Sequence, residues 1–83
     1  MSKRRSKYNI RLYDDENTSF NTVIQSLIAI CNHNFYQATQ CANIVHNTGS
    51  CIIYNSYEDD VEEVLELLMS EGLVVRIEKR GRK

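Results

Sequence analysis

The sequence predicts one small α+β domain with its elements in the order β-α-α-β-α-β, in which the helices pack on one face of a three-stranded sheet. The chain has 83 residues, of which 42% are hydrophobic, so it can build one modest core. Short strand-like segments are separated by longer segments whose apolar residues recur at helical spacing. With no Pro and three Gly, these segments are almost uninterrupted.

The strands are expected at 8–13, 51–54 and 73–77. In the first, apolar and polar residues alternate, which is typical of a strand with one buried face. The second reads Cys-Ile-Ile-Tyr and is apolar throughout, so we expect it to be the central strand.

Capping residues predict the bounds of the first two helices. Thr18 and Ser19 can cap the first helix. Asn34, followed three residues later by Gln37, resembles a capping box for the second. Gly49 is placed to end that helix in the left-handed conformation.

The third helix is expected to start at Ser56 and to end at Gly72. Its first turn carries Glu58, Asp59 and Asp60, where the helix dipole favours negative charge. Its apolar residues recur at helical spacing, so we expect it to cover the sheet.

Charge is strongly segregated along the chain, although the net charge is only −1. All ten Lys and Arg lie at Arg11 or earlier or at Arg76 or later, so the segment 12–75 contains ten acids and no Lys or Arg. Such a body attracts cations and repels phosphate, which disfavours nucleic acid as a partner. The expected organisation is a flexible basic tail at 1–7, a core domain at 8–78 and a basic C-terminal tail at 79–83.

The chain is expected to be cytoplasmic, with no membrane partner. No run approaches the roughly 20 apolar residues of a membrane span, and the basic N-terminus lacks the apolar stretch of a secretory signal. Cys31, Cys41 and Cys51 are odd in number and form no CxxC pair, which favours reduced, packed thiols.

Three adjacent acids, Asp14, Asp15 and Glu16, follow the first strand. Like charges repel, so these residues belong in a solvated turn or facing a cation. Calcium is weakly indicated, because the loop lacks the alternating oxygen donors and the glycine of an EF-hand. His46, near the end of the second helix, is either an exposed residue that suits the helix dipole or an acceptor beside this loop. In the second case Asp14, Asp15 and His46 would together accept from one ammonium group.

Catalytic and metal sites are weakly indicated. A nucleophilic Cys31, Cys41 or Cys51 would need an electropositive setting, which the middle of the chain cannot supply. Cys31, His33, Cys41 and His46 are zinc ligand types, but they lack the ligand spacing of a zinc site. We therefore predict no catalytic residue, no metal and no cofactor, and an enzyme is the least favoured class.

Two stretches together resemble the ClpS family, the small adaptors that deliver N-degron substrates to the Clp protease. The first is 12–20, with Asp14-Asp15 and Thr18, and the second is 37–49, which ends in Val45-His46-x-x-Gly49. The resemblance implies an adaptor that recognises a bulky hydrophobic N-terminal residue, Leu, Phe, Tyr or Trp. It also implies delivery of that substrate to a Clp-type AAA+ unfoldase, ClpA or ClpC-like.

The resemblance also implies the residues of the binding site. Where the family has Asn, this chain has Asp14, and the family often has Met at the place of Phe20 and near that of Ala42. The implied ligands of the substrate α-amino group are Asp14, Asp15 and His46, and the implied hydrophobic pocket consists of Thr18, Phe20, Val23, Ala42, Val45 and Leu73.

Two further functions remain open at this point. A ClpS-like decoy would bind N-degrons or the unfoldase without delivering cargo. A small nucleic-acid-binding protein would act through its basic tails alone, since the body is acidic and has no basic helix face.

Overall fold

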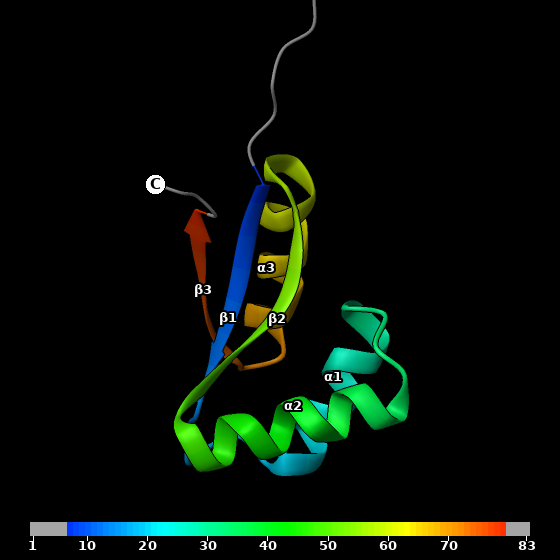
Figure 1. Cartoon of the computed structure of the whole chain (residues 1–83), viewed down its shortest axis with the longest axis vertical. Helices are drawn as coiled ribbons and strands as arrows, with labels where there is room; N and C mark the ends of the chain where they lie inside the picture. The colour runs from blue at the N-terminus through cyan, green and yellow to red at the C-terminus, as the bar shows by residue number, and fades with distance from the viewer. Residues whose placement is uncertain (1–6, 80–83) are drawn as a thin grey trace, which may run out of the picture.

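The computed structural model describes residues 7–79, so the expected tails 1–7 and 79–83 lie almost entirely outside the described residues. The element order is the predicted β-α-α-β-α-β, in a single α+β domain (Figure 1). The described strands run one residue beyond the expected core 8–78 at each end. The elements are β1 (Lys7–Tyr13), α1 (Phe20–Ile30), α2 (Phe35–Thr48), β2 (Ser50–Tyr57), α3 (Glu58–Ser70) and β3 (Val74–Lys79).

The three strands form an antiparallel sheet in the order β2-β1-β3, so the prediction that the second strand is central was wrong. The pairing of β2 with β1 contains a bulge. Ile10 pairs with Tyr54 and Arg11 with Ile52, which leaves Ile53 as an extra residue. Ile53 is 3% exposed, whereas Ile52 on the open face is 41% exposed. One face of β2 is therefore covered and the other is open, so the apolar run does not mark a strand buried on both faces.

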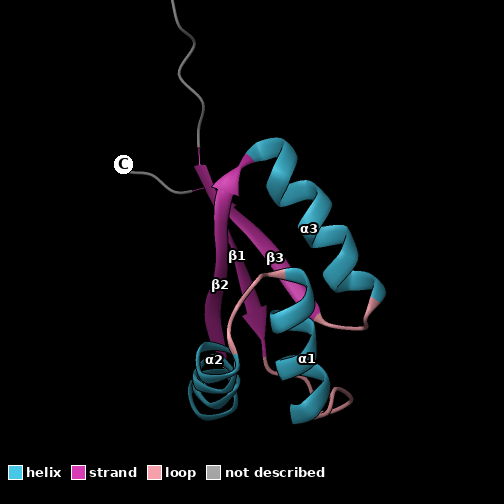
Figure 2. Cartoon of the chain, turned by 90° about the vertical axis from the view of Figure 1, so that its right-hand side faces the viewer, coloured by secondary structure: helices cyan, strands magenta, loops and turns pink. Residues whose placement is uncertain are grey.

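Helix α3 lies along one face of the sheet, and α1 and α2 lie toward the end of the sheet at which β2 begins (Figure 2). Helix α3 contacts all three strands, while α2 contacts β2 and α1. The core centres on Ile10 and Leu12 of β1, which are fully buried beneath the helices. On the opposite face Arg11 donates from Nε to Glu78 Oε2 at 2.8 Å. The alternation in β1 thus separates a core face from a polar face, as expected for a half-buried strand.

The caps of α1 and α2 confirm the sequence prediction. The Ser19 side chain accepts from the backbone N–H of Thr22, and Asn34 and Gln37 form a full capping box. Gly49 ends α2 with φ of 100°, in the left-handed region that suits glycine. These caps set where the two helices begin and where α2 turns into β2.

The expected start of α3 at Ser56 was wrong by two residues. Ser56 still pairs with Tyr8 in the sheet, and Tyr57 is the N-cap residue without a side-chain cap hydrogen bond. The Ser56 hydroxyl instead donates to Asp60 Oδ2 at 2.7 Å, in the first turn of the helix. Sheet pairing therefore outweighed the capping preference of serine. At the other end, Gly72 follows α3 with φ of 89°.

None of the helices within residues 7–79 combines the length and the apolar character that crossing a membrane requires.

Candidate functional site

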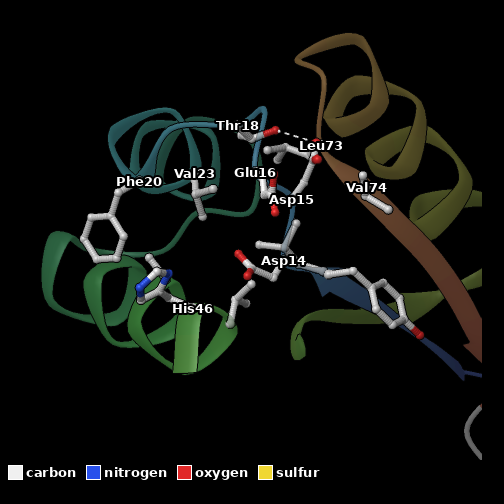
Figure 3. Close-up of a pocket in the computed structure, with 13 residues that line it drawn as sticks. Asp14, Asp15, Glu16, Thr18, Phe20, Val23, His46, Leu73 and Val74 are labelled. Atoms are coloured by element: carbon white, nitrogen blue, oxygen red, sulfur yellow. Dashed lines mark hydrogen bonds between the residues drawn. The ribbon is translucent and has the colours of Figure 1, made fainter. Parts of the chain in front are cut away.

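A pocket of about 390 Å³ lies where the loop after β1 meets α1, α2 and the turn before β3 (Figure 3). It contains every site residue expected from the sequence, from both implied groups. Four further residues line it that sequence reasoning did not select. The expected residues are Asp14, Asp15, Thr18, Phe20, Val23, Ala42, Val45, His46 and Leu73, and the additional ones are Leu12, Tyr13, Glu16 and Val74.

A backbone hydrogen bond joins the two sequence motifs. The N–H of Asp14 donates to the carbonyl oxygen of Gly49 at 2.9 Å. Because Gly49 closes α2, this bond brings the acidic loop to the end of the helix that carries His46. The juxtaposition expected from the sequence is therefore present.

Asp15 is the best-positioned carboxylate of the loop. It is half-buried, and its backbone carbonyl accepts from the N–H of Thr18 at 3.1 Å. Its Oδ1 accepts from the N–H of Asn17 at 3.3 Å, and its Oδ2 accepts from the Thr18 hydroxyl at 3.1 Å. An ionised carboxylate has about four acceptor positions, so lone pairs remain for a ligand. Asp15 is thus held in place and still able to accept.

Asp14 and His46 are both exposed at the mouth of the pocket. In Figure 3 the Asp14 carboxylate points toward α2, and the His46 imidazole rises from that helix on the side where Phe20 lies. The lining includes the carboxylates of Asp14, Asp15 and Glu16 but neither Lys nor Arg. This end of the pocket therefore favours a cation.

The remaining wall is apolar. Ala42 and Val45 of α2 and Leu73 before β3 are buried, and Val23 of α1 is half-buried. Phe20, the first residue of α1, is 44% exposed and stands at the rim. One apolar side chain that enters the pocket would meet these groups while its own backbone lies near the acids.

The residues that sequence reasoning missed are close neighbours of those it selected. Tyr13 directly precedes the acidic motif, and Val74 directly follows Leu73. These two residues pair across β1 and β3, which places both at the same end of the sheet. Their position next to motif residues was the one feature of the sequence that could have indicated that they line the pocket. Their pairing depends on the strand order, which the sequence did not predict correctly.

The cysteines lie away from this pocket, in or against the core. Burial raises the pKa of Cys31 to about 12, with a smaller contribution from Cys41. Burial likewise raises the pKa of Cys41 to about 11, helped by the neighbouring Cys51 thiol. Protonated thiols of this kind are poor nucleophiles, in agreement with the predicted packed cysteines.

His33 also belongs to the core region rather than to the pocket. Its Nε2 hydrogen-bonds with the Ile53 carbonyl oxygen at 2.8 Å, and its Nδ1 lies 4.0 Å from Cys41 Sγ. His46 lines the pocket instead. Among residues 7–79, no group of three or more His, Cys, Asp or Glu is arranged to hold a metal ion.

Comparison with known proteins matches the chain to one family and one similar structure. The family model for the ATP-dependent Clp protease adaptor protein ClpS matches residues 3–76. The fold is similar to that of Agrobacterium tumefaciens ClpS2 bound to L-phenylalaninamide, with a TM-score of 0.78 and 20% identity over 93% of this chain and 100% of that one. No curated protein matches the chain in sequence.

The family match confirms the resemblance expected from the two motifs. It covers both of them and nearly all of the described residues. Proteins of this family bind and deliver substrates rather than catalyse a reaction, as predicted. The chain belongs to the ClpS family, the N-degron adaptors of the ATP-dependent Clp protease.

Proposed function

We propose that the pocket binds the first residue of substrates that begin with Leu, Phe, Tyr or Trp. The α-ammonium group is held by Asp15, Asp14 and His46, and the first side chain packs on the apolar wall. The observation that carries the proposal is the composition of the lining, in which Asp14, Asp15, Glu16 and His46 share one pocket with the buried apolar side chains of Ala42, Val45 and Leu73. The L-phenylalaninamide bound to the similar ClpS2 combines a free ammonium group with an aromatic ring, as the first residue of a Phe-starting substrate does.

Binding of the α-ammonium group and burial of the first side chain together account for a measurable affinity. A protonated amino terminus has three donors, and each hydrogen bond with a charged partner contributes about 1.5–3 kcal/mol. Burial of a Leu or Phe side chain adds about 1.5–3 kcal/mol. After the costs of association, a dissociation constant in the micromolar range or below is expected.

Selectivity follows from the need for both groups in one residue. An internal Phe has no ammonium group for the carboxylates. An N-terminal Asp or Glu would bring negative charge to a lining that already contains Asp14, Asp15 and Glu16. The site therefore accepts a hydrophobic residue only at the start of a chain.

Cargo bound in this way is proposed to pass to a Clp-type AAA+ unfoldase, ClpA or ClpC-like, in the cytoplasm. The family match supports the Clp protease as the destination. The three free cysteines, with the pKa of Cys31 and of Cys41 raised by burial, suit a reducing compartment.

Fluorescence anisotropy with two labelled peptides tests the site. Both begin with Phe, one with a free amino terminus and one N-acetylated. The free peptide should bind at least about tenfold more tightly, because acetylation removes the charge and two of the donors. Equal affinity for the two peptides would overturn the proposal. Degradation of a Phe-starting reporter by a Clp protease with and without the protein then tests delivery.

A further inference from the structure

The Thr18 hydroxyl stands between two oxygen atoms, one on the acidic loop and one on the turn that leads into the apolar wall. It lies 3.1 Å from Asp15 Oδ2, the hydrogen bond dashed in Figure 3, and 3.2 Å from the carbonyl oxygen of Gly72. Gly72 is 54 residues away in sequence and directly precedes Leu73 of the apolar wall. A hydroxyl has one proton, which these two acceptors share in this geometry.

We propose that Thr18 is a positioning residue, whose hydroxyl holds the Asp15 carboxylate at a set distance from the apolar wall at Leu73. This inference rests on the proposed function of the pocket and assigns Thr18 a different role from that of a lining residue. The group that would touch the substrate ammonium is Asp15, and Thr18 acts through it.

The contacts of Asp15 explain why the hydroxyl matters. Its carboxylate has one other described hydrogen bond, from the N–H of Asn17 at 3.3 Å, near the long end of the range for such bonds. Without the Thr18 hydroxyl, the carboxylate would be held by that bond alone and could rotate toward solvent. Removal of the hydroxyl therefore loosens the proposed ammonium acceptor without removing it.

The contact with Gly72 links the Thr18 hydroxyl to the turn before Leu73. Gly72 has φ of 89°, and the turn that it forms leads into the buried Leu73. In one amino acid the ammonium nitrogen and the side chain are separated by a fixed covalent distance. A pocket that recognises both groups gains affinity when its two walls are held at the matching separation. The Thr18 hydroxyl contacts the Asp15 carboxylate and the residue that directly precedes Leu73.

Two substitutions separate this role from that of an apolar lining residue. Thr18→Val keeps the branched shape and the methyl group but removes the hydroxyl. Thr18→Ser keeps the hydroxyl but removes the methyl group. A positioning role predicts that the Val variant is the impaired one, whereas an apolar lining role predicts that the Ser variant is.

A matched control is available on α2. The Thr39 hydroxyl oxygen is buried without a hydrogen-bond partner among the described residues, and Thr39 does not line the pocket. Thr39→Val is therefore the same chemical change at a position where no hydrogen bond is lost.

The experiment measures the affinity of each variant for the free and the N-acetylated Phe-starting peptide. We expect Thr18→Val to weaken binding of the free peptide about tenfold and to reduce its advantage over the acetylated peptide. The affinity of Thr18→Ser for the free peptide should stay within about threefold of that of the wild type. Thr39→Val should bind the free peptide as tightly as the wild type does. A purely structural loss would weaken both peptides equally and leave their ratio unchanged.

The outcomes distinguish this inference from the function on which it rests. If the wild type binds the two peptides equally, the proposed function fails and the inference fails with it. If the wild type discriminates but Thr18→Val does so equally well, or Thr18→Ser is the weaker variant, the inference alone is overturned. If Thr18→Val fails to fold, Thr18→Ser still tests the positioning role. A loss of affinity for the free peptide in Thr18→Ser would contradict that role.

Discussion

The backbone N–H of Asp14 donates a hydrogen bond of 2.9 Å to the carbonyl oxygen of Gly49. It connects the first residue of the acidic loop with the residue that closes α2. The proposed ammonium ligands come from both sides of this bond, Asp14 and Asp15 from the loop and His46 from the last turn of the helix. The geometry of the helix end therefore bears directly on the geometry of the site.

Replacement of Gly49 by Ala is expected to destabilise the protein by about 1–2 kcal/mol, the usual cost of the left-handed conformation for a residue with a Cβ. Steric overlap adds nothing, because a Cβ at this position would meet no atom within 4 Å. Urea denaturation measures the free energy of unfolding. Gly49→Asn is the control and should cost less, since Asn tolerates the left-handed region better. An Ala variant as stable as the wild type would show that φ of 100° is not maintained in solution.

Asp15→Asn is expected to weaken binding of the free Phe-starting peptide by about tenfold or more, because a hydrogen bond to a charged group contributes about 1.5–3 kcal/mol. Anisotropy titration measures the change. Glu66→Gln is the matched control, since it also removes one negative charge and lies on the exposed side of α3 outside the pocket. If both variants lose affinity equally, overall charge rather than the Asp15 carboxylate governs binding.

Phe20→Ala is expected to change which N-terminal residue is preferred. The ring stands at the rim, and loss of apolar contact equivalent to one buried CH₂ group should weaken a Leu-starting peptide by about 0.8 kcal/mol, or about fourfold. A Trp-starting peptide should lose less, because the wider mouth admits the larger side chain. Phe35→Ala is the control, because Phe35 is 68% exposed and lies outside this pocket. An unchanged ratio of the two affinities in Phe20→Ala would exclude Phe20 as a determinant of preference.

The buried Cys31 thiol predicts a loss of stability at alkaline pH. Burial raises its pKa from 9.0 to about 12, so the folded chain keeps a proton that the unfolded chain releases. The contribution of the protonated Cys31 thiol to the stability of the fold is fully present below the pKa of the unfolded chain. It is lost as the pH rises through the pKa of the folded chain. The expected slope between the two values is up to about 1.4 kcal/mol per pH unit.

Denaturation of the wild type and of Cys31→Ala under reducing conditions, at about pH 8 and about pH 10, measures this effect. The advantage of the wild type over the variant should shrink at the higher pH. Val64→Ala is the control, since it truncates a buried side chain that does not titrate, and its deficit should be the same at both values. A constant difference for Cys31→Ala would contradict the raised pKa.

Local patterns in the sequence predicted the order of the elements, and the resemblance to the ClpS family supplied nine of the residues that line the pocket. The capping box of Asn34 and Gln37 and the left-handed Gly49 depend on neighbours within one helical turn, so they can be read directly. The two motifs that resemble the ClpS family contain most residues of the pocket, and the structure brings these together. Their roles in binding stay a prediction that the peptide experiments test.

Contacts between distant segments required the tertiary structure, because they depend on which strands pair and in which register. The apolar β2 lies at the edge of the sheet and not at its centre, and pairing with Tyr8 keeps Ser56 in that strand. The bond from Thr18 to Gly72 spans 54 residues, and no periodicity or spacing in the chain indicates it. The two motifs, through the family resemblance that they carry, thus named most of the residues that surround the pocket. Only the tertiary structure decided how Thr18 connects the acidic loop of the pocket to the turn before its apolar wall.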